Sequence, residues 1–184
     1  MSIRTTIPTS MSTIRRQPRA GAPVTHARDG GLVLFHIGMT VHRPWRPDLW
    51  LPVVTAMPAM LSELERARAA ARRGDGPDPG FLGAETLLGA RGPWVVQYWA
   101  DLASLHAYAH AGGGLHRTAW SRFSRTARRH PGAVGIWHET YVVDAGGVET
   151  FYSGGADVGL GRVGGTVPVG RRGATARERL GSTV

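Results

Sequence analysis

Residues 31–41 read GLVLFHIGMTV, a run of apolar and β-branched residues that predicts a buried β-strand. Successive side chains of a strand point to opposite faces of its sheet. One of the two sets is entirely apolar and is expected to face the helices; it consists of Val33, Phe35, Ile37 and Met39. His36 then points to the opposite face, together with Leu34 and Gly38.

The segments that follow this strand have a recognisable order. Residues 50–72 carry apolar side chains at three- and four-residue spacing, which predicts an amphipathic helix. Two short strands are expected at 81–88 and 94–99, helical segments at 102–111 and 115–129, and a last strand at 133–143. This β-α-β-β-α-β order predicts an α+β domain with a ferredoxin-like fold. We expect the first and third strands side by side in the sheet, with the fourth beside the first.

Several residues mark where the helices begin, bend and end. Pro58 predicts a kink in the first helix, and Arg72-Arg73-Gly74 predicts its C-terminus, with glycine as the stop signal. Asp101 is expected as the N-terminal cap or as an acidic residue in the first turn of the second helix.

Helices cover only one face of such a sheet, so the other face needs a partner. A second copy of the same sheet supplies it most simply, which predicts a homodimer with twofold symmetry, a dimeric α/β barrel. Residues 148–152, VETFY, are interpreted as a short fifth strand that two copies could exchange.

The two ends of the chain differ in composition from this domain, which is expected to span 29–153. Residues 1–28 predict a disordered basic leader, and residues 154–184 a flexible tail rich in glycine and arginine. The net charge of +9 lies mostly in these ends, because the stretch between them is nearly neutral. Every basic residue is arginine, which indicates a bias of composition rather than a phosphate-binding surface, so we expect no nucleic-acid partner.

Other classes of protein are disfavoured by what the sequence lacks. It contains no cysteine, which excludes disulfides, thiolate metal ligands and a cysteine nucleophile. It has no apolar run of membrane-spanning length and no signal-peptide pattern. The sequence therefore predicts a cytoplasmic protein that does not bind membranes.

Each expected strand carries one polar residue among apolar neighbours, and these four are His36, Glu85, Gln97 and His138. If the strands are in register, all four line a single cavity between two paired sheets, and an apolar cavity with a few convergent polar groups is the usual small-molecule site. The alternative is that the histidines are hydrogen-bonded core residues and Glu85 faces solvent. A slip of one residue would move any of them to the other face.

Two further motifs have chemical interpretations. His106 and His110 have a metal-ligand spacing on a helix, but they lack the glutamate of a zinc protease motif, so no metal site is expected. His116 and Trp120 share a helix face and are expected at the mouth of the cavity. The glycines of residues 154–165 lack the lysine and the helix of a phosphate-binding loop.

Seven stretches in order carry a resemblance to a known family: FHIGMTVHRPW at 35–45, LWLPVVTAMPAML at 49–61, GFLGAETL at 80–87, VVQYW at 95–99, LHAYAH at 105–110, LHRTAW at 115–120 and GIWHETYVV at 135–143. Together they resemble the monooxygenase-like family typified by a fungal enzyme of fumagillin biosynthesis. The resemblance runs from about residue 32 to 152 and implies a dimeric α/β-barrel fold.

The resemblance implies oxidation of an apolar small molecule of the secondary-metabolite type, along one of two routes. In a cofactor-free route, His138 or His36 removes a proton and Gln97 with Trp99 holds an enolate-like oxygen. In a haem route, resembling aldoxime dehydratases, His36, His116 or His138 is the axial ligand. The sequence lacks a marked haem motif, which favours the cofactor-free route. Glu85, His116 and Trp120 are the remaining candidates for substrate binding, and a non-catalytic ligand-binding module is the alternative from another class.

Overall fold

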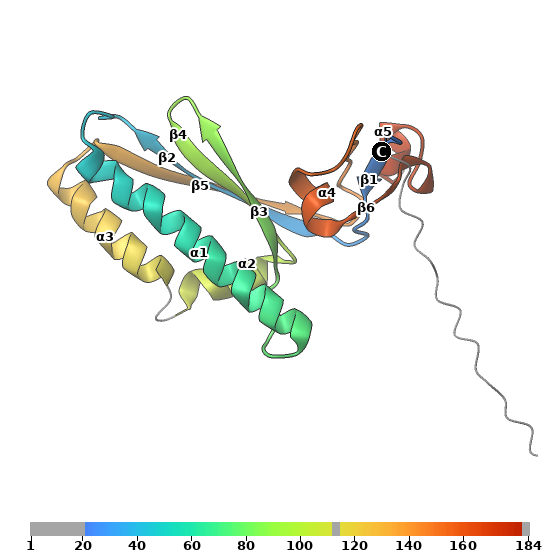
Figure 1. Ribbon diagram of the computed structural model, residues 1–184, viewed down its shortest axis with the longest axis horizontal. Coiled ribbons are helices and arrows are strands. Elements are labelled where there is room, and N and C mark those ends of the chain that lie inside the picture. Colours follow the sequence, from blue (N-terminus) through green and yellow to red (C-terminus); the bar gives the residue numbers. More distant parts are fainter. Residues whose placement is uncertain (1–20, 112–114, 182–184) are drawn as a thin grey trace, which may run out of the picture.

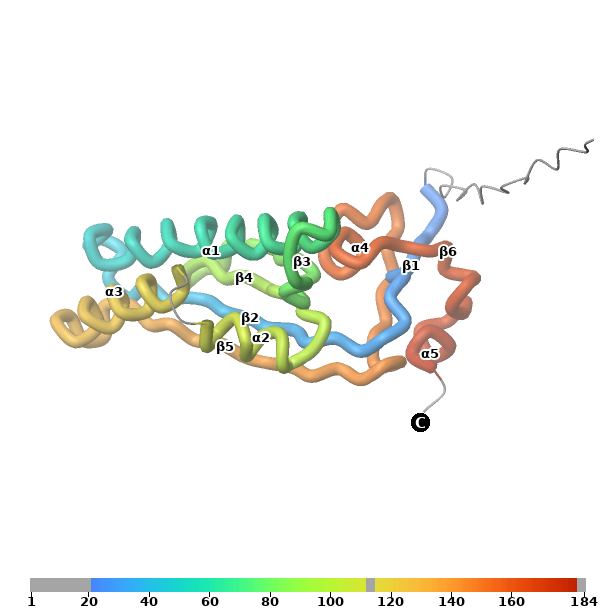
Figure 2. Tube along the Cα trace, turned by 90° about the horizontal axis from the view of Figure 1, so that it is seen from below, coloured from blue at the N-terminus to red at the C-terminus, as the bar shows by residue number. Residues whose placement is uncertain are grey.

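The computed structural model describes residues 21–111 and 115–181, and its main body is a four-stranded antiparallel sheet with helices on one face (Figures 1 and 2). The strands are β2 (Leu32–Val41), β3 (Phe81–Gly89), β4 (Gly92–Trp99) and β5 (Val134–Val143), in the spatial order β3-β4-β2-β5. The helices are α1 (Pro47–Arg73), α2 (Leu102–His110) and α3 (Leu115–Arg129). This confirms the predicted ferredoxin-like fold, including its strand order.

The helix termini follow the signals in the sequence. Helix α1 begins at Pro47, a few residues earlier than expected, and continues through Pro58 as one helix. It ends at Gly74, whose φ of 80° is left-handed and whose N–H bonds the carbonyl of Ala71 at 3.0 Å. At the start of α2, the Asp101 carboxylate accepts the Ser104 N–H at 2.7 Å, and this bond lowers the pKa of Asp101. Both predicted helix boundaries are therefore confirmed.

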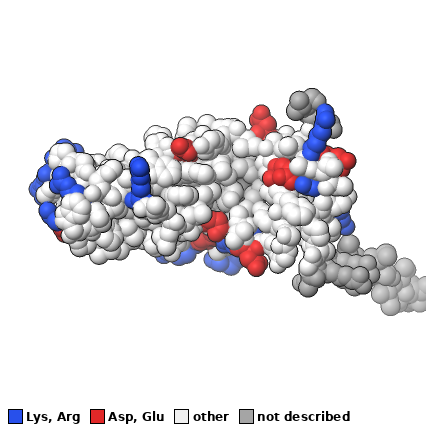
Figure 3. All heavy atoms as spheres, turned by 90° about the horizontal axis from the view of Figure 1, so that it is seen from above, with Lys and Arg blue, Asp and Glu red and all other residues white. Residues whose placement is uncertain are grey.

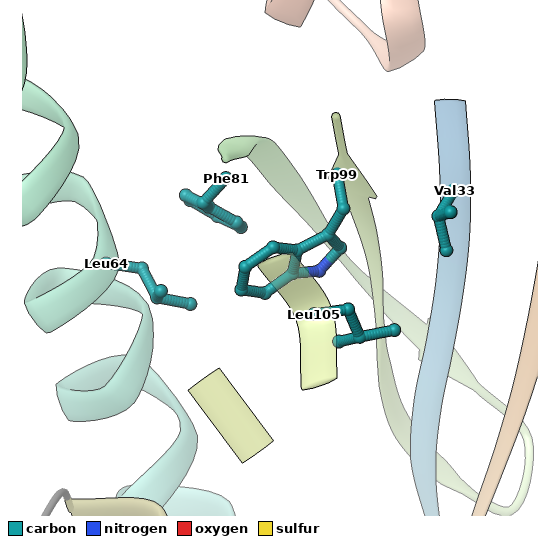
Figure 4. Close-up of a cluster of buried hydrophobic side chains, with 5 residues drawn as sticks. All are labelled: Val33, Leu64, Phe81, Trp99 and Leu105. Carbon is teal, nitrogen blue, oxygen red and sulfur yellow. The ribbon is translucent and has the colours of Figure 1, made fainter. Parts of the chain in front are cut away.

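The hydrophobic core lies between the sheet and helices α1 and α2, around the indole of Trp99 (Figure 4). Trp99 is fully buried, and its ring meets the ring of Phe81 edge-on at 5.2 Å. Leu64 reaches this cluster from α1, Leu105 reaches it from α2, and Val33 contributes from the central strand. The core therefore ties both helices to the predicted apolar face of β2.

The described parts of the two predicted disordered ends form a small lobe beside the sheet, contrary to the prediction that they lack fixed structure (Figure 1). Strand β1 (Val24–His26), within the predicted leader, pairs with β6 (Thr166–Pro168). Helix α4 (Gly159–Gly164), the 3-10 turn η1 (Val169–Arg171) and helix α5 (Ala176–Arg179) belong to the predicted flexible tail. The leader's first 20 residues lie outside the described part of the chain.

Arginines of the predicted tail bind within this lobe. The guanidinium of Arg179 is nearly buried and pairs with the Glu149 carboxylate at 2.6 Å. Arg172 donates to the backbone carbonyls of Ala27 and Arg28. The segment lacks hydrophobic periodicity and is stabilised by these charge-assisted bonds instead. For this reason a pattern of apolar residues did not predict the lobe.

Buried polar side chains join the first strand of the lobe to the segment after β5. The Thr150 hydroxyl lies 3.1 Å from Nδ1 of His26 and accepts the backbone N–H of His26 at 2.8 Å. Burial, followed by the charge of Arg172, lowers the pKa of His26. The segment expected as a fifth strand at 148–152 is not one: only Tyr152 pairs, as an isolated bridge to Val24 of the same chain.

Because Gly38 has no side chain, the indoles of two tryptophans can meet above it at the centre of the sheet. Gly38 lies opposite Trp94 on one side and Trp137 on the other, and the two rings meet edge-on at 6.2 Å. A Cβ on Gly38 would lie 2.6 Å from Cε2 of Trp137 and 2.7 Å from Cβ of Trp94. Both distances are too short, so an alanine here must displace an indole or the backbone.

Gly38→Ala is therefore expected to lower the free energy of unfolding by about 1–3 kcal/mol, measured by urea denaturation. Gly135→Ala on β5 is the matched control, since the nearest atom to its added Cβ is 3.9 Å away. Equal stability of the two variants would show that the indoles do not require glycine.

Candidate functional site

The strand registers place the four predicted polar residues on two different faces of the sheet. Residues opposite each other in an antiparallel ladder share a face. Gln97 lies opposite Phe35, and His138 lies opposite Ile37, so both are on the helix side. His36 and Glu85 both lie opposite Val96 and are on the open face. The prediction that all four line one cavity is therefore wrong, because Gln97 points to the same side of the sheet as the core residues of β4.

On the open face, His36 has Glu139 rather than His138 as its neighbour on β5. The ring of Tyr141 meets the His36 ring edge-on at 5.7 Å. The Tyr141 hydroxyl donates to the Glu139 carboxylate at 2.7 Å, and this bond raises the pKa of Tyr141. The open face thus brings a histidine, a phenol and a carboxylate together near its exposed edge strand.

Glu85 anchors the terminal lobe to the sheet. Its Oε1 accepts the backbone N–H of Gly159 at 3.0 Å and Nε of Arg162 at 2.6 Å. Val163 of the same short helix packs over Gly83 of β3. The carboxylate that was predicted to bind substrate is therefore occupied by contacts within the chain.

A large cavity among the described residues lies between α1 and the β3–β4 hairpin, on the helix side of the sheet. Its volume is about 450 Å³, within the usual range for small-molecule sites. Apart from the Thr86 hydroxyl, its side chains are hydrophobic, with Trp50 donating its indole N–H away to Pro44. Those that surround the space include Val53, Val54, Met57, Leu61, Leu88 and Val95.

Two smaller cavities, of about 70 and 60 Å³, adjoin the large one beneath helices α2 and α3. Ile37 and Met57 line all three. His116 lines both small cavities; Trp120 lines the larger of them, and Gln97 lines the other. His116, Trp120 and Gln97 thus line small cavities that share residues with the large one, whereas the described lining of all three cavities includes neither His36 nor His138.

Trp99 and His138 contact protein rather than these cavities. Trp99 was expected to hold a substrate oxygen, but it donates its indole N–H to Oε1 of Gln97 at 3.0 Å. The bond turns this amide oxygen toward the core, leaving the amide nitrogen of Gln97 as the group's remaining donor. His138 is exposed on the edge strand, with its ring 5.7 Å from that of Phe35.

Each of the three helices that cover the sheet carries a buried polar atom without a partner in the described part of the chain. Oε2 of Glu63 on α1, the hydroxyl of Tyr108 on α2 and Nδ1 of His116 on α3 are buried and have no hydrogen-bond partner among the described residues. The rings of Tyr108 and His116 are 6.2 Å apart. Burial, and then the charge of Glu63, raises the pKa of Tyr108 to about 12.

Sequence reasoning found only His116 among these three residues. Tyr108 follows the core residue Leu105 by three positions, and Glu63 precedes the core residue Leu64. A polar residue beside a core position was the available signal, but it does not show whether the side chain turns inward.

The residues present do not fit a haem group. His36 and His138 lie on opposite faces of the sheet, and neither lines the described interior. His116 faces cavities of about 70 and 60 Å³, roughly the volume of two water molecules each and far too small for a porphyrin. The large cavity has no histidine in its described lining.

The described residues were searched for metal-binding groups and for membrane-length helices. They contain no group of three histidine or carboxylate side chains placed to hold a metal ion. Nδ1 of His110 lies 2.8 Å from the carbonyl of His106. The four-residue spacing of these histidines therefore allows a hydrogen bond within α2. Among the described helices, none has the length and hydropathy needed to cross a membrane.

The middle of the face opposite the helices is largely uncharged, with basic side chains gathered at one end of it (Figure 3). At the other end, basic and acidic side chains lie close together. This face therefore has no continuous basic stripe of the kind that tracks a nucleic-acid backbone.

Two solved structures were compared with this chain. An aldoxime dehydratase, OxdRE, determined in complex with butyraldoxime, aligns with a TM-score of 0.58 at 18% identity, covering 82% of this chain and 42% of that one. SnoaB of Streptomyces nogalater, a cofactor-independent oxygenase, aligns with a TM-score of 0.41 at 12% identity, covering 60% of this chain and 91% of that one. The first likeness supports the fold alone.

Sequence comparison is more specific. Monooxygenase af470 of Aspergillus fumigatus is 30% identical over 175 residues, which cover 89% of this chain and 58% of that protein. This chain therefore spans a little over half the length of its curated relative. The sequence model of the monooxygenase af470-like family matches residues 32–160, from the central strand to the start of the terminal lobe. By this match over most of its length, the chain belongs to the monooxygenase af470-like family.

Proposed function

We propose that this chain is a monooxygenase that oxidises an apolar small molecule, of the secondary-metabolite type, in the cavity between α1 and the β3–β4 hairpin. The observation that carries the proposal is the cavity itself, with about 450 Å³ of space and an almost wholly hydrophobic lining. Membership of the family and the name of its fungal relative supply the type of reaction.

The reaction balances without a cofactor if the substrate supplies the electrons. A methylene group next to an aromatic ring or a carbonyl loses a proton to a base, and the resulting carbanion is oxidised by dioxygen. One oxygen atom becomes the new carbonyl and the other leaves as water, so that the methylene and one dioxygen give one carbonyl and one water. An apolar lining suits this chemistry because hydrophobic side chains around the reactive carbanion displace water from it.

Filling the cavity tests its role. Val54→Phe places a ring into the space and is expected to lower kcat/KM for anthrone, an apolar compound with an activated methylene, at least tenfold. Oxygen uptake and incorporation of label from ¹⁸O₂ into the product are the measurements. Val142→Phe is the control, because Val142 is 64% exposed and lies outside the described cavity lining. Equal loss in both variants, or no loss in Val54→Phe, would contradict this site.

The sequence assigned proton removal to His36 or His138, but neither lines this cavity, so the assignment stays a prediction that substitution tests directly. A general base contributes about 10²–10⁴-fold to the rate, so replacing the true base by alanine is expected to lower kcat by that factor. Both variants, His36→Ala and His138→Ala, are measured by the pH profile of anthrone turnover. If neither changes kcat by more than about threefold, neither histidine is the base.

We also propose that two chains pair through the open face of the sheet. Helices leave this face uncovered, and α4 reaches it only at the β3 end (Figures 1 and 2). Apolar side chains, half-buried in the single chain, follow its centre: Leu34, Trp94, Val96 and Trp137. Pairing two such faces would complete a core of two stacked sheets.

Val96→Arg is expected to convert the pair into single chains, because pairing would bury an unpaired guanidinium. Light scattering should give twice the chain mass of 19.7 kDa for the unaltered protein and the single mass for the variant. Thr140→Arg on the opposite face, at the exposed edge strand, should leave the pair intact. A single-chain mass for the unaltered protein would rule out the pairing.

A further inference from the structure

We propose that Tyr108 and His116, with Glu63 beside Tyr108, bind a hydroxyl or enol oxygen of the substrate, so that the site takes a phenol or an enolised ketone rather than a hydrocarbon. This inference rests on the proposed function and adds the polar end of the substrate to its apolar cavity.

The first support is the cost of leaving these groups unpaired. A buried polar group without a partner costs about 1–3 kcal/mol, and native proteins hold only a few such groups per hundred residues. Here two of the three such atoms among the described residues, the Tyr108 hydroxyl and Nδ1 of His116, belong to side chains that line the same cavity of about 60 Å³. Two unpaired groups on one cavity indicate that a ligand supplies the missing partners.

The second support is the chemical match to one hydroxyl group. The raised pKa of Tyr108 keeps its phenol protonated at neutral pH, so it can donate a hydrogen bond. Nδ1 of His116 accepts one in the tautomer that carries the proton on Nε2. A substrate hydroxyl that accepts from Tyr108 and donates to His116 satisfies both groups at once.

The third support is the position of the group relative to the large cavity. Tyr108 and His116 line the cavity of about 60 Å³, which shares Ile37, Met57 and Leu61 with the large one. This space exceeds the order of 10–15 Å³ that one water needs. Met57, whose side chain is flexible, lines both spaces, so a ring system in the large cavity could extend its oxygen toward Tyr108.

Two probes of the same shape separate hydrogen bonding from apolar packing: 1-naphthol and 1-methylnaphthalene. Their binding to the full chain is measured by equilibrium dialysis without turnover. We expect the unaltered protein to prefer 1-naphthol at least about tenfold, the equivalent of one good hydrogen bond. Tyr108→Phe should remove most of this preference while leaving the affinity for 1-methylnaphthalene unchanged.

A second pair of variants keeps the test decisive if Tyr108→Phe folds poorly. His116→Leu should lose the preference, whereas His116→Asn, which places an amide group near the position of Nδ1, should retain part of it. His106→Leu is the control, because His106 is exposed on α2. Circular dichroism and melting temperature establish which variants are folded.

Each outcome decides the inference separately from the proposed function. The inference is overturned if the unaltered protein shows no preference, or if the preference survives both Tyr108→Phe and His116→Leu. An ordered water would then be the hydrogen-bond partner of these polar atoms. Preference for 1-naphthol without oxygenation of any probe supports the inference and contradicts the proposed monooxygenase activity. Oxygenation of anthrone without any preference for 1-naphthol supports the activity and contradicts the inference.

Discussion

The register of the central strand determines which side chains reach the interior of this protein. Strand β2 pairs with β4 on one side and β5 on the other, and Val33 thereby lies in one row with Trp99 and Val142. Because strand side chains alternate, this single row decides the face of every other residue in the three strands. It places the indole of Trp99 in the core and His36 on the uncovered face.

The helices fill the space over the sheet only in part, and the cavities are the space that stays unfilled. At one end, Trp99 and Phe81 occupy the space between α1 and the sheet. At the hairpin end, the facing side chains are smaller, among them Val53, Val54 and Val95, and a space of about 450 Å³ remains. A cavity of that size in a core is costly, since each lost contact weakens packing. A ligand that fills it would restore those contacts.

The fold could be predicted because its signals are local. The alternation of residues 31–41, the spacing of residues 50–72 and the glycine at Gly74 each specify an element without knowledge of the rest. The terminal lobe could not be predicted, because ion pairs such as Arg179–Glu149 join residues thirty positions apart. The site was predicted in part for a similar reason. The choice of face for Gln97 depends on pairing with Phe35, which no pattern within β4 reveals.

The two faces of the sheet have different roles in this chain. On the helix side, Tyr108 and His116 bring two buried polar atoms without partners among the described residues to a cavity that shares lining residues with the large apolar one, which is the arrangement expected for binding an apolar molecule with one polar group. On the open side, the described polar contacts are made within the chain: Glu85 holds α4, and Tyr141 binds Glu139. Substitutions on the two faces should therefore affect binding and association independently, since side chains of adjacent residues in a strand point apart and share no packing. That independence would be a direct consequence of the register of β2.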